Sequence, residues 1–282
     1  MTPQPALDPY LTSIGEPVED LSRIMASQPF RSVGPSLDRA DLEALVAAGR
    51  PALLRRSTPP ALVEADLMDG RGRLTDSGRS VHAMLTAADG RLRVESVRGS
   101  TPLVLDVYVR QGWALTVSTR SPAAIAEPPR GQDIVTTATR IGLDHVDAAR
   151  VPMDVAAWVG LAPAWSLATE PVDVPEALLR RRVDDPTTPP APDADAHLRY
   201  VWQQPWFLWT LQASGSTSGR IMVNAGRAGH FALTTPDGGP AAAEAGLVGF
   251  RAMPSAAVWR DLVHLAAVAA GTPLPDVEGQ PT

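Results

Sequence analysis

An internal repeat limits the architectures open to this chain more than any other feature of its sequence. Residues 103–116 read LVLDVYVRQGWALT, and residues 220–234 read RIMVNAGRAGHFALT. Each segment is a β-rich run, an Arg-x-Gly turn, and an aromatic residue followed by Ala-Leu-Thr. A hairpin that occurs twice indicates two similar halves, which pack about a pseudo-twofold axis for the same reason that identical subunits do. Because only two copies occur, a solenoid or a propeller is not expected.

A second echo follows each hairpin and consists of an arginine, a tryptophan and a leucine at the same spacing, with a proline just after the arginine. The two sets are Arg150, Trp158 and Leu161, and Arg251, Trp259 and Leu262. We interpret them as a strand, a proline and a helix in each half. A coincidence between two segments rich in Ala, Val and Leu is the open alternative.

Composition excludes several classes of function. A chain of 282 residues forms one large domain or two small ones. All 25 basic residues are arginine, which is typical of a GC-rich, actinobacterial genome and says little about chemistry. The net charge of −6 argues against nucleic-acid binding, which needs a positive surface to release counterions. Without cysteine, the chain has no disulfide, thiolate metal site or cysteine nucleophile.

The sequence shows no targeting or spanning segment. The first 20 residues lack a basic region followed by an apolar one, so no signal peptide is predicted. No apolar run approaches the roughly 20 residues that cross a bilayer. We therefore expect a cytoplasmic protein with no direct membrane insertion.

Hydrophobic periodicity separates expected helices from expected strands. Helices are expected at 37–48, 59–67, 76–85, 155–161 and 255–269. Strands are expected at 91–97, 104–109, 113–118, 133–140, 199–202, 206–213, 220–225, 229–235 and 246–252, with a Pro-rich loop at 122–130. Tight hairpins exclude an all-parallel sheet, because parallel neighbours need long crossovers. We predict an α+β fold that is quasi-twofold, with a central antiparallel β-sheet built from two meander repeats and flanking helical bundles.

Changes in composition suggest domain boundaries. Residues 183–196 are rich in Pro and Asp and form the best linker candidate, because proline stiffens the segment and the acids keep it solvated. The expected units are a Pro-rich N-terminal arm at 1–36, a first α/β half at 37–182, the linker at 183–196, a second α/β half at 197–270, and a disordered tail at 271–282.

No motif in the sequence predicts a reaction centre. None of the five histidines has a metal-ligand spacing with another, and no HExxH occurs. The loop at 215–219 lacks the lysine and the following helix of a phosphate-binding loop. The run Arg180–Arg182 is interpreted as a complement to a helix dipole. We therefore predict no catalytic residue, no metal site, no cofactor and no enzymatic activity.

The segment VWQQPWFLWT at 201–210 contains three of the seven tryptophans. In a strand, Trp206 and Leu208 point to one face, and Phe207 and Trp209 point to the other. An edge strand buried on one side would leave aromatic surface exposed for a partner, since aromatic residues anchor protein interfaces. The alternative is that helices cover both faces and the segment is core.

Two family resemblances bear on function. Residues 61–85 are reminiscent of the wing side of winged-helix proteins, but their surroundings carry balanced charge, and a DNA reader should be basic on one face. The run ALVEADLMDGRGRL, the following helix and the strand-rich LDVYVRQGWALTV instead resemble the EspG family of ESX (type VII) secretion-associated proteins. The segments GRIMVN and GHFALTTP and the final Pro-Ser-x-x-x-Trp helix are similar to that family's second half.

The resemblance to the EspG family implies a cytosolic chaperone without enzymatic activity. Such a protein binds the helical tip of a secretion substrate, a PE–PPE-like heterodimer, and keeps it soluble for export. Aromatic density and position in the second meander select the candidate partner-binding residues, and no family motif places a contact at them. These residues are Trp206, Phe207, Trp209, Arg220 and Met222. A DNA-binding regulator and a binding protein of another pathway are the alternative functions.

Overall fold

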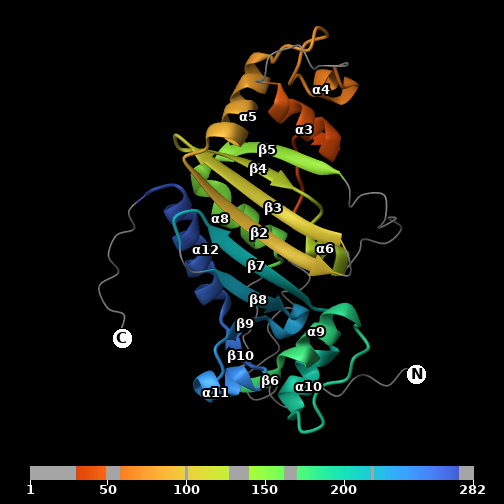
Figure 1. The fold of residues 1–282 in the computed structure, drawn as a ribbon, viewed down its shortest axis with the longest axis vertical. Helices are drawn as coiled ribbons and strands as arrows, with labels where there is room; N and C mark the ends of the chain where they lie inside the picture. Colours follow the sequence, from red (N-terminus) through yellow and green to blue (C-terminus); the bar gives the residue numbers. More distant parts are fainter. Residues whose placement is uncertain are drawn as a thin grey trace, which may run out of the picture.

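The computed structural model describes residues 30–48, 58–98, 101–126, 140–161, 170–216 and 219–272. Its centre is a ten-stranded, wholly antiparallel sheet, in the spatial order β1-β5-β4-β3-β2-β7-β8-β9-β10-β6 (Figure 1). The strands are β1 Ser36–Leu37, β2 Gly90–Arg98, β3 Thr101–Arg110, β4 Trp113–Ser118, β5 Ile141–Asp147, β6 Val172–Pro175, β7 Phe207–Ala213, β8 Arg220–Asn224, β9 His230–Thr234 and β10 Leu247–Met253. The predicted α+β fold is confirmed.

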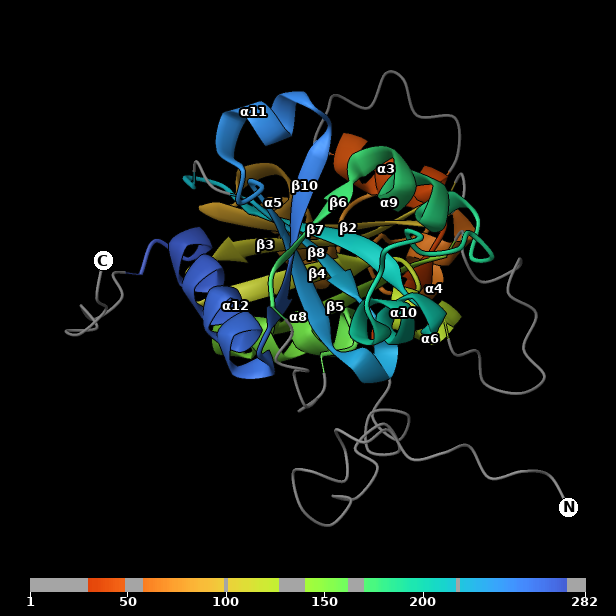
Figure 2. The ribbon, with the colours of Figure 1, turned by 90° about the horizontal axis from the view of Figure 1, so that it is seen from below.

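Helices cover both faces of the sheet (Figures 1 and 2). They are α3 Arg39–Ala47, α4 Pro60–Glu64, α5 Asp76–Ala87, α6 Pro122–Ala126, α8 Val151–Trp158, α9 Glu176–Asp184, α10 Ala196–Gln203, α11 Gly239–Glu244 and α12 Ser255–Ala269. Two short 3-10 helices, η2 and η3, span Ala148–Arg150 and Gly226–Ala228. Thr75 caps α5 by accepting a hydrogen bond from the Gly78 N–H.

Three apolar clusters attach the helices to the sheet. The largest packs α8 and α12 on one face of the central strands β2, β3 and β7. A second packs α9 and α10 on the opposite face, over β8, β9 and β10. The third packs α3, α4 and α5 on that opposite face, over β4 and β5. Because side chains alternate along a strand, Val107 and Tyr108 of β3 point to different clusters.

The sheet repeats its topology on either side of its centre. Strands β2 and β7 pair in the middle, β2-β3-β4-β5 run outward to one edge, and β7-β8-β9-β10 run outward to the other. A helix follows each run, α8 after β5 and α12 after β10, and these two helices pack together. The edges are closed by β1 and β6, which precede their own halves in sequence. The duplicated hairpin therefore corresponds to two halves with the same order of elements.

The strand, proline and helix predicted from the second echo occur in both halves, but the echoed residues are not structurally equivalent. Register places Val146 opposite Ala114 in the first half and Arg251 opposite Ala232 in the second, so Arg251 occupies the strand position of Val146. Its expected counterpart Arg150 lies beyond its strand, in η2. The tryptophans differ too, since Trp158 is fully buried whereas Trp259 is 38% exposed. The halves share their topology, but not these residue positions.

The hairpin turns also differ in detail. Arg110 ends β3 before a two-residue turn in which Gln111 and Gly112 both have positive φ, the backbone geometry that such short hairpins require. Arg227 instead lies within η3, in a longer connection. The two arginines of the shared Arg-x-Gly pattern therefore occupy different local structures.

Several expected elements need correction. The strand expected at 199–202 is part of helix α10, which Asp195 caps and which buries Leu198, Val201 and Trp202 on one side. The fourth strand is β5 at 141–147; of the stretch expected at 133–140, residues 133–139 lie outside the described residues. The loop expected at 122–130 begins with the short helix α6.

The expected linker at 183–196 is tied into the second half. Ala194 is buried in the cluster of α9 and α10, and Asp195 caps α10. The topology also places β6 and α9 with the second half, although both lie mainly before residue 183. Residues 1–29 of the predicted arm and 273–282 of the predicted tail lie outside the described residues. Separate domains with the expected boundaries stay a prediction.

Residues 30–35 lie along β5 in close backbone contact. The carboxylate Oδ1 of Asp144 accepts hydrogen bonds from the backbone N–H groups of Val33 and Gly34, both at 2.7 Å. The Leu143 N–H donates to the Pro35 carbonyl at 3.0 Å. Gly34 approaches so closely that a Cβ there would stand 1.8 Å from the Leu143 carbonyl oxygen. This segment therefore depends on glycine at position 34.

We expect Gly34→Ala to lower the free energy of unfolding by about 1–3 kcal/mol, because the added methyl overlaps backbone that cannot yield without losing the Asp144 hydrogen bonds. Urea unfolding followed by circular dichroism measures the change. Gly70→Ala is the matched control, since a Cβ at Gly70 meets nothing within 4 Å. Equal unfolding midpoints for the two variants would contradict the close docking of residues 30–35.

Candidate docking surface

The described helices leave much of one face of the central strands uncovered, although α9 contacts β2 and α5 contacts β3. It lies between the α3–α5 group and the α9–α10 group, opposite α8 and α12, and is turned toward the viewer in Figure 1. We call this surface the open band. Its side chains are Arg91, Arg93 and Glu95 of β2, Val104 and Asp106 of β3, Thr210 and Gln212 of β7, and Ile221 of β8.

The polar half of the open band is a connected ion network. The Asp106 carboxylate is mostly buried and receives Arg91 at 2.8 Å and Arg93 at 3.0 Å. Arg93 also pairs with Glu95, and Arg91 stacks on the Tyr108 ring with its guanidinium carbon 5.0 Å from the ring centroid. Burial, and then the Asp106 charge, raise the pKa of the Tyr108 phenol. The network fixes these side chains in one array, which reduces the entropy lost when a partner binds.

The other half of the open band presents the apolar side chain of Ile221 beside the polar Thr210 and Gln212. Ile221 is 48% exposed, although isoleucine is among the residue types most often buried. Leu208 and Leu233 are half-buried on the same face, next to the α9–α10 cluster. The open band therefore offers an apolar edge beside a fixed array of charges, the combination found in protein interfaces with an apolar core and a polar rim.

The five residues selected from sequence do not form one surface. Phe207, Trp209 and Met222 are buried in the cluster beneath α8 and α12, on the face opposite the open band. These three residues are part of the hydrophobic core, which was the alternative interpretation of the aromatic segment. Arg220 pairs with Asp261 of α12 at 2.8 Å. A role in partner binding stays a prediction only for residues with exposed surface.

Trp206 is half-buried and held by its neighbours. The guanidinium of Arg182 lies 4.9 Å from its ring centroid, and Trp202 meets it edge-on at 5.3 Å. Arg182 is buried and donates to the carbonyls of Trp202 and Gln204 at 3.0 and 2.9 Å. Burial lowers the pKa of Arg182. Arg182 lies in the last turn of α9, the position expected for a complement to the helix dipole, and it also caps the end of α10 from inside the fold.

The alternation of residues in β2 indicates the open band. The site prediction relied instead on the density of aromatic residues in 201–210. In β2 the charged residues Arg91, Arg93 and Glu95 alternate with the buried Leu92 and Val94. Strict alternation indicates a strand with one solvated face. Strand β2 lies at the centre of the sheet. Its charged face therefore indicates a part of the sheet surface that the described helices leave largely uncovered.

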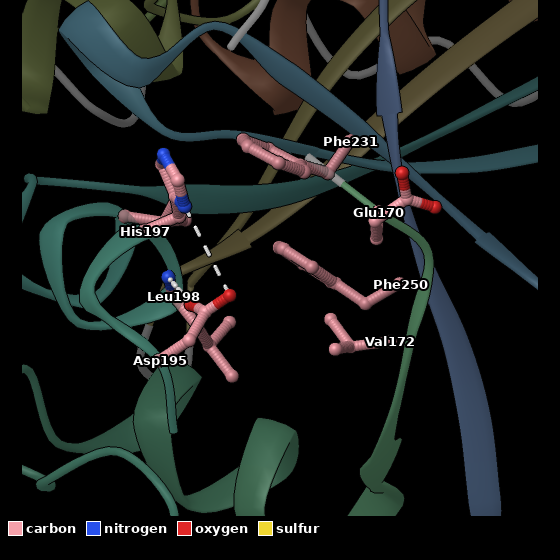
Figure 3. Close-up of a pocket in the computed structure, with 8 residues that line it drawn as sticks. Glu170, Val172, Asp195, His197, Leu198, Phe231 and Phe250 are labelled. Atoms are coloured by element: carbon pink, nitrogen blue, oxygen red, sulfur yellow. Dashed lines mark hydrogen bonds and ion pairs between the residues drawn. The ribbon is translucent and has the colours of Figure 1, made fainter. Parts of the chain in front are cut away.

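A small pocket beside α10 lacks room for a substrate. It is floored by the stacked rings of Phe231 and Phe250, 4.6 Å apart, with Glu170 and the pair Asp195–His197 around them (Figure 3). The Nδ1 of His197 lies 3.9 Å from Asp195 Oδ2. The cavity volume is about 10 Å³, which holds one water molecule.

The described ranges hold neither a cluster of metal ligands nor a membrane-spanning helix. No three His, Asp or Glu side chains lie close enough together there to hold a metal ion. In the same part of the chain, no helix combines the length and apolar content needed to cross a bilayer.

Comparisons with known proteins give a likeness in structure but none in sequence. No protein-family model matches the chain, and no curated protein matches it in sequence. Among solved structures, the chain is similar to the type VII secretion system chaperone EspG5 of Mycobacterium tuberculosis, solved in complex with a PE25–PPE41 dimer. The identity is 12%, the match covers 85% of this chain and 98% of that chain, and the TM-score is 0.45. It is a likeness of overall fold, and no residue role is carried over from it.

Proposed function

We propose that this chain is a non-enzymatic chaperone or adaptor that binds a helical secretion substrate on the open band and keeps it soluble for export. The finer assignment, also proposed, is to the cytoplasm and the ESX (type VII) pathway, with a PE–PPE-like heterodimer as partner. The observation that carries the proposal is the bare face of β2, β3, β7 and β8, with α3–α5 and α9–α10 on either side.

The chemistry of the open band supports protein binding over simple solvation. An antiparallel sheet can leave one face in water, and such a face is then uniformly polar. Here Ile221 is exposed beside charges that are already paired with one another. A partner helix could cover the apolar edge without leaving a charge of this chain buried and unpaired, which is the main penalty at an interface.

The same network disfavours the DNA-binding alternative. Arg91 and Arg93, the arginines of the open band, are neutralised by Asp106 and Glu95. Phosphate binding requires uncompensated positive charge. The helices of the winged-helix-like segment, α4 and α5, contribute their apolar residues to the cluster over β4 and β5. The remaining alternative, a binding protein of another pathway, differs from the proposed function in its partner, so identifying the partner distinguishes the two.

We expect Ile221→Glu to abolish partner capture while leaving the fold intact, because it places a charge on the apolar edge of the open band. The measurement is affinity capture from native cytosol followed by mass spectrometry, with thermal melting to check stability. Wild type should recover a helical secreted heterodimer, and Ile221→Glu should lose it at least tenfold.

Met153→Glu is the matched control for this experiment, since Met153 is 58% exposed but belongs to α8, on the opposite side of the sheet. It should capture the partner like wild type. Capture that survives Ile221→Glu would exclude the open band. Specific recovery of DNA or a small metabolite would exclude the chaperone function.

A further inference from the structure

A buried histidine lies where the two halves of the fold meet. His230 of β9 is almost wholly buried, and its ring meets Trp209 of β7 edge-on, with centroids 6.1 Å apart. Among the described residues, neither ring nitrogen has a partner at full hydrogen-bond geometry, although the Val159 carbonyl lies near enough to the ring to favour its protonated form. Buried polar groups in proteins are nearly always paired, so an orphaned imidazole needs an explanation.

The neighbour of His230 across the hairpin ties the halves together. Asn224 of β8 stands opposite His230. Its side-chain amide donates to the Val159 carbonyl at 2.7 Å and to the Gly160 carbonyl at 3.3 Å. Both carbonyls lie at the carboxyl end of α8, a first-half helix, whereas Asn224 and His230 belong to the second half. Asn224 thus satisfies helix-end carbonyls that would otherwise be orphaned.

We propose that His230, Asn224 and the carboxyl end of α8 form a latch between the two halves that acid opens. In neutral imidazole one nitrogen is a donor and the other an acceptor, whereas in the imidazolium both are donors. A protonated His230 therefore needs two acceptors, whereas the Val159 carbonyl, which already accepts from Asn224, can offer it one further lone pair. The other ring N–H stays a buried donor without an acceptor, and separating the hairpin from α8 admits water to it at the cost of the Asn224 hydrogen bonds.

No carboxylate compensates a charge on His230. On the strands beside it, Arg251 is engaged with Thr234 and Asp237, and Arg220 is paired with Asp261 of α12. On α8, Asp154 is paired with Arg150 in the first turn, at the end away from Val159. The other residues against the ring, Trp209 and Asn224, are uncharged. The imidazolium would be a buried cation without a counter-ion.

Burial lowers the pKa of His230 to about 4, whereas an opened, solvated histidine titrates near 6.5. The latch is therefore fully closed above pH 6.5, and opening becomes easier as the pH falls from 6.5 towards 4. Linkage between these two pKa values favours the open form roughly 20-fold more at pH 5 than at pH 7. Histidine is the side chain whose titration falls in this range.

Amide hydrogen exchange tests the latch, with rates corrected for the intrinsic effect of pH. In the wild type, peptides covering 155–161 and 222–231 should open roughly 20-fold more often at pH 5 than at pH 7. His230→Gln should remove this pH dependence. His264→Gln should keep it, because His264 is an exposed histidine on α12. If His230→Gln fails to fold, His230→Phe serves as the non-titrating variant.

A second readout uses the wild type alone. The imidazole resonance of His230 should titrate below pH 5, and exchange at 155–161 should change in the same pH range. Titration near 6.5, equal corrected exchange at both pH values, or an unchanged pH dependence in the non-titrating variant would each overturn the proposal.

Discussion

Replacement of Trp209 by alanine is expected to lower the free energy of unfolding by about 3–5 kcal/mol. Trp209 is 0% exposed and lies at the centre of the cluster that joins the sheet to α8 and α12. Removing the indole leaves a cavity lined by a rigid sheet and two packed helices, which cannot collapse to fill it. Guanidinium unfolding followed by far-ultraviolet circular dichroism measures the loss.

The control for this prediction is another tryptophan on the same sheet. Trp113 of β4 is 51% exposed and stacks on the His145 ring at 5.0 Å. Trp113→Ala should therefore lower the free energy of unfolding by less than about 1 kcal/mol. Similar losses for the two variants would mean that Trp209 is not the core residue described, and would restore it as a candidate for direct partner contact.

Arg182→Ala should lower the free energy of unfolding by about 3 kcal/mol. Two buried carbonyls, those of Trp202 and Gln204, would lose a charged donor, and each unpaired carbonyl costs about 1–3 kcal/mol. The Trp206 ring would also lose the guanidinium stacked on it. Because α9 and α10 meet through this side chain, proteolysis should in addition cut the variant within 185–195 more readily.

Arg181→Ala is the matched control, since Arg181 is the exposed neighbour of Arg182 on the same helix. Its unfolding midpoint should equal that of wild type. Arg182→Lys should fall between the two. In wild type a single nitrogen, Nη2, donates to both carbonyls, and a lysine ammonium could replace it, but it lacks the planar guanidinium that lies over the Trp206 ring. If Arg181→Ala and Arg182→Ala were equally stable, the buried role of Arg182 would be refuted.

The regular part of the fold was predictable because local chemistry determines it. The alternation of apolar and polar residues in 103–118 and the Gln111–Gly112 turn define the first hairpin, and the N-cap residue Thr75 precedes α5. Helix α10 was missed because the aromatic residues of 201–210 suit a strand, while the cap Asp195 and the buried Val201 and Trp202 favour a helix. Tertiary packing decides between such readings, and a sequence window does not contain it.

The candidate site was less predictable than the fold. Alternation correctly separated Phe207 and Trp209 from Leu208, but which face is covered depends on α8 and α12, which come from distant parts of the chain. The burial of Arg182 likewise depends on carbonyls about 20 residues away. Residue type alone therefore selected the buried aromatic face of the sheet. The candidate surface, the open band, lies on the opposite face.

The two outermost strands restrict how another chain can reach the sheet. Strand β1 has only two residues, and β6 has four and ends at Pro175, which has no N–H to donate. Short margins that carry proline are poor templates for an incoming strand. These short edge strands disfavour edge-to-edge aggregation of the sheet, and they leave little free backbone for an added peptide strand to pair with. A partner that binds the sheet itself must therefore contact the side chains of a sheet face, since the edges offer little backbone for strand pairing.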